Sequence, residues 1–201
     1  HWKGAGCVIP VFSLRSKHSF GVGDFGDLKR MVDWVAFTGQ RVLQILPIND
    51  TTITNTWTDS YPYNSISIYA FHPQLVDLNA LPALKDKHAA KEFEAKRKEL
   101  KALPQIDYET VNNTKRDYLH LLFEQEGEKT MATEEFQQFF ADNEHWLLPY
   151  AAFSYLRDKN GTPDFRTWSS YNVYKTSSVK ARCNKSSKAY PQISFYYYGQ
   201  Y

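Results

Sequence analysis

Two short apolar runs near the N-terminus flank one amphipathic stretch. The runs Cys7–Phe12 and Val42–Ile48 are rich in branched apolar residues, which is typical of buried parallel strands. The stretch Asp24–Thr38 between them predicts a helix, because Asp24 suits an N-cap and Gly39 a C-terminal cap. One face of this helix carries the apolar side chains Phe25, Leu28, Val32 and Val35. The pattern predicts a strand–helix–strand unit with parallel strands and a right-handed crossover.

Charged, helix-favouring sequence dominates the rest of the chain. The spacing of apolar residues and the breaks at proline and glycine predict helices over Lys85–Leu103, Asp107–Glu126, Thr133–Asp142, Pro149–Lys159 and Gln192–Tyr201. The segment Asp164–Lys188 has few periodic signals and predicts irregular structure. We therefore expect three parts: residues 1–80 with the strands, a helical part over 81–190, and the start of a further helix over 191–201.

The loop that follows the second apolar run has a different composition. Asn49 and Asp50 begin it, and Trp57, Asp59 and Tyr63 follow. In barrels of alternating strands and helices, binding and catalytic groups lie on the loops after the strands. A sugar needs aromatic rings for its C–H faces and carboxylates or amides for its hydroxyls. The loop offers both, so the sequence predicts a carbohydrate site here.

Two motifs resemble those of a known family. The stretch Asp59–Pro73, DSYPYNSISIYAFHP, is similar to the signature loop S-P-Y-x-S-x-S-x-F-A-x-N-P of amylomaltases, the 4-α-glucanotransferases of glycoside hydrolase family 77. Gly21–Leu28, GVGDFGDL, resembles their G-x-G-D-F-G-D-L helix entry. Tyr61 in place of Ser and His72 in place of Asn fit the plant-cytosolic disproportionating enzymes and their bacterial relatives. The resemblance covers Trp2 to Tyr201.

The resemblance implies a fold and an activity. The fold would be α/β: the first two strands of a TIM (β/α)8 barrel, plus a mostly helical inserted subdomain. The activity would be transfer of α-1,4-glucan segments by a retaining double displacement, which requires two carboxyl groups roughly 5 Å apart. The family draws these carboxylates from later strands, so no residue of this chain is assigned a catalytic role. We interpret Arg116–His120, a loose mimic of the nucleophile motif, as structural, and Arg157–Asp158 as a solvated pair.

The resemblance also implies roles for the loop residues. Tyr63 aligns with the tyrosine that stacks on the glucose next to the scissile bond, and a packed core tyrosine is the alternative. Asp59 would bind sugar hydroxyls or cap a turn, and Trp57 would be a stacking platform. Asn49 and Asp50 would touch glucan or brace the loop as turn residues. His72 is expected to be a structural histidine with satisfied hydrogen bonds.

Composition narrows the remaining possibilities. The 201 residues have a net charge of +2, which argues against a nucleic-acid partner. Cys7 and Cys183 form no metal or redox motif, as expected of reduced thiols in the cytoplasm. No cofactor, metal or membrane partner is expected, and the first residue, His1, suggests a piece of a longer protein. The expected partners are an α-1,4-glucan or maltooligosaccharide and the remainder of the barrel. The alternatives are a non-catalytic carbohydrate-binding module and a helical interaction domain.

Overall fold

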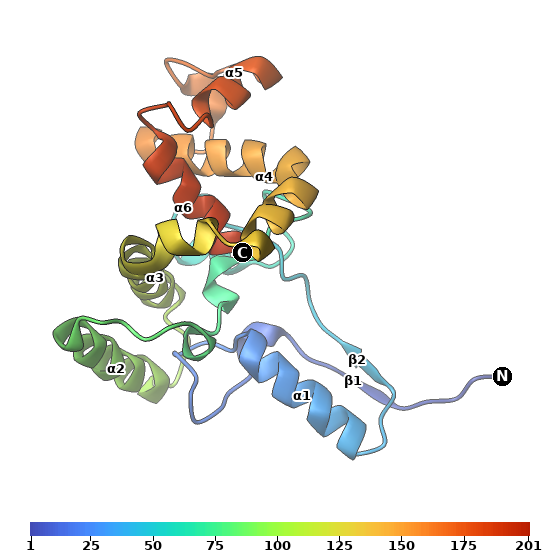
Figure 1. Cartoon of the computed structure of the whole chain (residues 1–201). Coiled ribbons are helices and arrows are strands. Elements are labelled where there is room, and N and C mark those ends of the chain that lie inside the picture. Colours follow the sequence, from blue (N-terminus) through green and yellow to red (C-terminus); the bar gives the residue numbers. More distant parts are fainter.

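The computed structural model describes all 201 residues and contains the strand–helix–strand unit. Strands β1 (Gly6–Val8) and β2 (Val42–Gln44) pair in parallel, with Cys7 opposite Leu43, and helix α1 (Phe25–Phe37) packs beside them (Figure 1). The Asp24 carboxylate accepts from the Asp27 N–H at 2.9 Å, and Asp27 accepts from the Asp24 N–H at 3.2 Å. This reciprocal capping box fixes the start of α1. The predicted parallel pairing and the cap are both confirmed.

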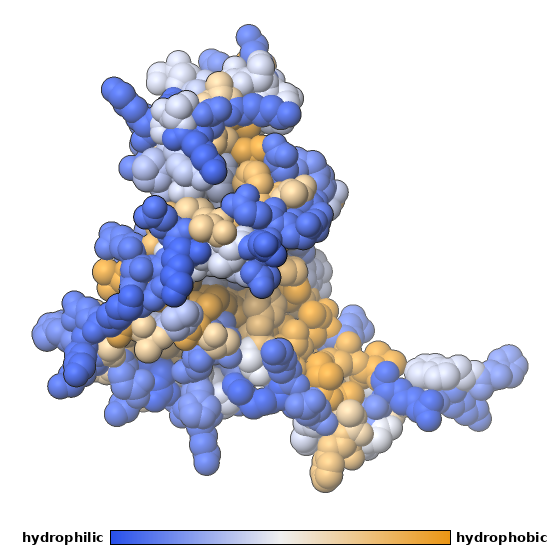
Figure 2. Space-filling model, viewed as in Figure 1, coloured by the Kyte–Doolittle hydropathy of each residue, from blue (hydrophilic) through white to orange (hydrophobic).

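The predicted strands are wrong in length and in burial. On the C-terminal side of β1, pairing extends only to the Ile9 N–H, which donates to the Gln44 carbonyl at 2.9 Å. Pro10 has no N–H to continue the ladder, and a 3₁₀ turn follows over Val11–Ser13. Val8 is 62% and Val42 45% exposed, because the sheet has only two strands and α1 is the main element packed against it. Figure 2 shows apolar side chains exposed in this part of the molecule.

Helices make up most of the remaining chain (Figure 1). The predicted helices at 85–103, 107–126 and 192–201 are confirmed with small shifts of their ends, apart from a five-residue extension of the second. Asp86, Asp107 and Thr133 cap the helices that follow them through side-chain hydrogen bonds to backbone N–H groups. The helices are α2 (Lys87–Ala102), α3 (Tyr108–Met131), α4 (Glu134–Asn160), α5 (Thr176–Arg182) and α6 (Tyr190–Gln200). The stretch after β2 contains 3₁₀ turns at Trp57–Ser60, Pro73–Leu75 and Leu78–Ala80.

Two predictions for the second half of the chain are wrong. The two helices expected on either side of residues 143–148 form one helix, α4, which runs through Pro149. Proline inside a helix removes one hydrogen bond and costs about 3 kcal/mol, but here Leu147, Leu148 and Tyr150 around it are buried in the core. The segment 164–188 is not irregular throughout, because it contains α5.

Two apolar clusters hold the helices together, and α6 belongs to both. Ile193 and Tyr197 pack with α4 and α5 in the first cluster. Phe195 packs in the second, with Phe20 and Val22 before α1 and with residues of α2 and α3. Helix α6 therefore joins the N-terminal unit to the lobe formed by α4, α5 and α6. No helix in the structure has the length and apolar character that a membrane crossing requires.

Candidate functional site

The loop between β2 and the turn at Pro73 closes on itself at its base. Asn49 and Phe71 form an isolated antiparallel bridge. The Asp50 N–H donates to the Ala70 carbonyl at 2.9 Å, and the His72 N–H donates to the Ile48 carbonyl at 2.9 Å. This closed base holds the residues between positions 50 and 70 as one loop, which follows the carboxyl end of β2. Asn49 itself is half-buried there.

Aromatic rings lie on the surface of this loop. Tyr63 is 61% exposed and Trp57 68% exposed. The Tyr61 ring lies 5.6 Å from the Tyr63 ring, centroid to centroid, with the planes tilted by 50°. Tyr63 is therefore not a packed core residue in this structure, and its ring is open to a ligand.

The Asp59 carboxylate faces the interior of the loop. It is buried and accepts from the backbone N–H groups of Thr54 at 3.0 Å and Asn55 at 2.8 Å. The hydroxyl of Thr51 donates to the Asp59 carbonyl. These bonds close a turn over residues 54–59, as the capping alternative for Asp59 expects.

The Asp50 carboxylate is also buried, and it binds a residue of α4. One oxygen accepts from the N–H of Thr52 at 2.9 Å and from its hydroxyl at 2.6 Å. The other accepts from the Tyr150 hydroxyl at 2.6 Å. Burial, and then the nearby Asp50 charge, raise the pKa of Tyr150 well above its usual value. The phenol stays protonated and donates, so Asp50 ties the loop to the lobe.

Helix α6 contributes a second attachment. The Gln200 side chain donates to the Phe71 carbonyl at 2.9 Å and accepts from the Phe71 N–H at 2.8 Å. It thus pairs with Phe71 as a neighbouring strand would. Sequence reasoning identified neither Tyr150 nor Gln200, because each lies more than 90 positions from its partner and belongs to no local motif.

Arg157 and Asp158 do not form the solvated pair that the sequence predicted. Arg157 is buried, donates to the Thr52 carbonyl at 2.8 Å and pairs with Asp158 at 2.9 Å. Burial raises the pKa of Asp158, but the Arg157 charge and hydrogen bonds outweigh this and hold that pKa below its usual value. Asp158 also accepts from the Tyr196 hydroxyl. The pair joins the loop, α4 and α6.

A small polar cavity lies among these groups. Its volume is about 60 Å³, and its lining includes Asp50, Asp59, Arg116 and Arg157. Ligand pockets measure about 300–1,000 Å³, so this cavity is too small for a sugar. Arg116 donates to the Asn55 side chain beside it, which supports a structural role for the Arg116–His120 stretch.

His72 makes fewer bonds than the sequence predicted. It is buried, and its Nδ1 accepts from the Gln74 N–H at 3.2 Å, while its Nε2 has no partner. Burial lowers the pKa of His72, so the ring is neutral. No group of three or more His, Cys, Asp or Glu side chains is placed to hold a metal ion.

The fold, a two-stranded parallel sheet with mostly helical sequence after it, is similar to part of the fold of amylomaltases. The amylomaltase from Streptococcus agalactiae, solved in complex with acarbose, superposes with a TM-score of 0.71 over 99% of this chain and 38% of that chain. The amylomaltase from Corynebacterium glutamicum gives a TM-score of 0.69 over 98% of this chain and 26% of that chain. Each is 20% identical to this chain, so the likeness establishes the fold.

Sequence comparison establishes the family. The family model described as 4-alpha-glucanotransferase, glycoside hydrolase family 77, matches residues 9–201. The 4-alpha-glucanotransferase DPE2 of rice (Oryza sativa subsp. japonica) is 37% identical over 100% of this chain and 21% of that protein. The 4-alpha-glucanotransferase of Chlamydia muridarum is 33% identical over 82% of this chain and 30% of that protein. The chain belongs to the 4-alpha-glucanotransferase family, and it spans between a fifth and a third of these two relatives.

Proposed function

We propose that this chain is the N-terminal part of the catalytic barrel of a 4-α-glucanotransferase. The complete enzyme would transfer α-1,4-glucan segments between maltooligosaccharides, or to glycogen-like acceptors, by a retaining double displacement. The observation that carries this proposal is the loop after β2. Its aromatic rings are exposed at Tyr63 and Trp57, while its carboxylates are turned inward. A stacking surface on a braced loop at the carboxyl end of a strand suits a sugar site of a barrel enzyme.

The chain would bind substrate without performing the bond cleavage. Retaining transfer needs a nucleophile and an acid–base, two carboxyl groups about 5–5.5 Å apart and accessible to the sugar. Asp50 and Asp59 are buried and accept hydrogen bonds from their own loop or from Tyr150. We therefore assign Tyr63 and Trp57 to glucan stacking, and Asp50, Asp59 and Asn49 chiefly to holding the loop that presents them. The catalytic carboxylates would come from elsewhere in the barrel.

The remainder of the barrel is the proposed protein partner. Val8 and Val42 on the strands are exposed, as are Trp34 and Phe37 on α1. Apolar residues gathered on one surface mark an interaction site, and further strands and helices of an eight-stranded barrel would cover this one. The proposal includes the division of the chain into residues 1–80, 81–190 and 191–201. It also includes a cytoplasmic location for the protein. Two free cysteines, Cys7 and Cys183, support a reducing compartment.

The test is transfer by the protein in its full natural length. Incubated with maltotriose, it is expected to form maltooligosaccharides longer than the substrate, together with shorter sugars, as resolved by anion-exchange chromatography. Binding of maltooligosaccharides without any longer product would instead support a non-catalytic carbohydrate-binding module. If the protein neither binds maltooligosaccharides nor transfers glucan segments, both functions are refuted.

A further inference from the structure

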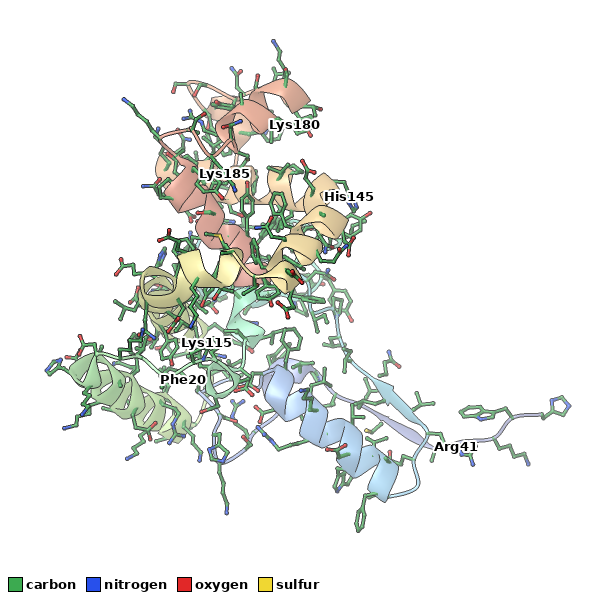
Figure 3. All side chains as sticks on the ribbon, viewed as in Figure 1. Phe20, Arg41, Lys115, His145, Lys180 and Lys185 are labelled. Atoms are coloured by element: carbon green, nitrogen blue, oxygen red, sulfur yellow. The ribbon has the colours of Figure 1, made fainter.

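A groove separates α4 from the segment that leads into α5. Its volume is about 420 Å³, within the usual range of small-molecule sites. Figure 3 labels two residues that line it, His145 on α4 and Lys180 on α5. It lies in the helical lobe, and none of the loop residues discussed above lines it.

The floor of the groove is apolar and rigid. Leu148 and Val179 line it and are buried members of the core between α4, α5 and α6. Ala141 and Pro149 complete the apolar lining. Close-packed cores keep their shape, so the groove does not depend on a mobile loop for its floor.

Two charged side chains in the groove have no ion-pair partner. Glu144 and Lys180 line it, and neither belongs to any ion pair of the structure. By contrast, two polar neighbours of Glu144 on α4 are paired with each other, because Trp146 donates its ring N–H to the Asn143 side chain at 2.8 Å. One carboxylate and one ammonium leave the groove near electrical neutrality. Free donors and acceptors without a dominant charge suit a neutral ligand with many hydroxyl groups.

Pro149 adds a further acceptor. A helix residue normally donates its N–H to the carbonyl four positions earlier, but proline has no N–H. The carbonyl of His145 therefore lacks its usual helical donor, and both residues line the groove. A backbone carbonyl without its helical donor is an acceptor to which a hydroxyl can donate.

An exposed aromatic ring stands at the groove. Tyr174 lines it and is 62% exposed. The His145 ring packs edge-on against Tyr69, with the centroids 5.5 Å apart. Tyr69 belongs to the loop that carries Tyr63, so the groove is in contact with that loop.

We propose that this groove is a second, non-catalytic binding site for α-1,4-glucan. A glucose ring would stack its C–H face on Tyr174, and its hydroxyls would bond to Glu144, Lys180 and the His145 carbonyl. The site would hold a polymeric substrate on the lobe while another part of the same polymer reaches the barrel. This inference rests on the proposed function, because both sites take the same class of substrate.

Affinity for glycogen tests the groove in the protein at its full natural length. Migration in native gels that contain glycogen gives a dissociation constant. Tyr174→Ala is expected to raise that constant about 10-fold and Lys180→Met about 3-fold, the losses typical of one aromatic contact and one hydrogen bond. The matched control is Phe165→Ala, since Phe165 is an exposed aromatic residue that packs against Trp168 and does not line the groove. The control is expected to keep the wild-type constant.

The outcomes separate this site from the Tyr63 loop. Unchanged glycogen affinity in both groove variants overturns the inference, as does an equal loss in the Phe165→Ala control. If Tyr63→Ala leaves transfer from maltotriose intact while Tyr174→Ala weakens glycogen binding, the groove stands and the Tyr63 platform fails. If Tyr63→Ala lowers transfer and both groove variants bind glycogen normally, the platform stands and the groove fails.

Discussion

The Tyr150 hydroxyl donates to a carboxylate oxygen of Asp50 over 2.6 Å, although the two residues are 100 positions apart in the chain. Both side chains are buried. The bond fastens the start of the loop after β2 to α4. The conformation of the loop therefore depends on α4, a helix that lies far from the loop in the sequence.

Replacing that hydroxyl tests the attachment. Tyr150→Phe keeps the ring but leaves one buried oxygen of Asp50 without its donor, which costs about 1–3 kcal/mol. Urea unfolding followed by circular dichroism is expected to show this loss. Tyr155→Phe is the control, because the Tyr155 hydroxyl makes no hydrogen bond. The ring of Tyr155, whose centroid lies 6.0 Å from the Lys159 ammonium, is kept in this variant. A control variant as destabilised as Tyr150→Phe would show that the bond to Asp50 is not the cause.

Tyr63 is expected to be a stacking platform in the complete enzyme. Tyr63→Ala is expected to lower kcat/KM for maltotriose by about 10-fold to 100-fold, equivalent to about 1.4–2.7 kcal/mol. Tyr63→Phe is expected to lose much less, because the ring face survives. Tyr63 is exposed, so both variants should unfold within about 0.5 kcal/mol of the wild type. Equal losses in the two variants would assign the role to the hydroxyl, and a normal kcat/KM in Tyr63→Ala would end the stacking hypothesis.

Residues 1–201 alone are expected to be inactive as a glucanotransferase. Asp50 and Asp59 are buried, and their carboxylates are occupied by hydrogen bonds. They therefore cannot supply the accessible carboxyl pair of a retaining mechanism. The measurement is chromatography of maltose or glycogen incubated with the purified chain, with a heat-inactivated sample as control. Release of glucose or formation of longer products above that control would place catalytic groups within this chain.

Lys115 is expected to make stability rise with pH. Its ammonium is buried on α3 (Figure 3) and donates to the Gln74 and Val76 carbonyls at 2.7 and 2.8 Å. Burial lowers the pKa of Lys115 from 10.5 to about 8, although Asp24, Asp77 and Asp27 nearby raise it. Between these two pH values the unfolded chain binds more protons than the folded one. The free energy of unfolding should therefore rise by an amount on the order of 2–3 kcal/mol across that window.

The control for this prediction is Lys115→Met, which has no group to titrate. In the wild type Asp24 has a raised pKa of about 6, also through burial, so it is charged from pH 7.5 upward. Urea unfolding at several pH values from 7.5 to 10.5 is expected to show the rise only in the wild type, after subtraction of the variant. Parallel curves would show that Lys115 does not titrate in this range.

Local signals were enough for the strand–helix–strand unit. The capping box at Asp24 and the positive φ of Gly39 depend on residues a few positions apart. Such local caps can be predicted from the neighbouring residues alone. Pro149 shows the limit of local signals. Its cost to a helix is a property of the sequence, but the packing of Leu147 and Leu148 that outweighs the cost belongs to the folded lobe.

The candidate site divides in the same way. The sequence by itself determined that aromatic and acidic residues meet in one loop after a strand, because this follows from their order along the chain. Only the tertiary structure decided that Tyr63 and Trp57 face outward while Asp50 and Asp59 face inward. It also decided that Arg157 is buried against Thr52 rather than solvated. An aspartate looks the same in the sequence whether its carboxylate lies in water or in a buried hydrogen-bond network. The Tyr150 hydroxyl of α4, 100 residues away, completes the environment of Asp50, since a buried charge is tolerated only where hydrogen-bond partners meet it.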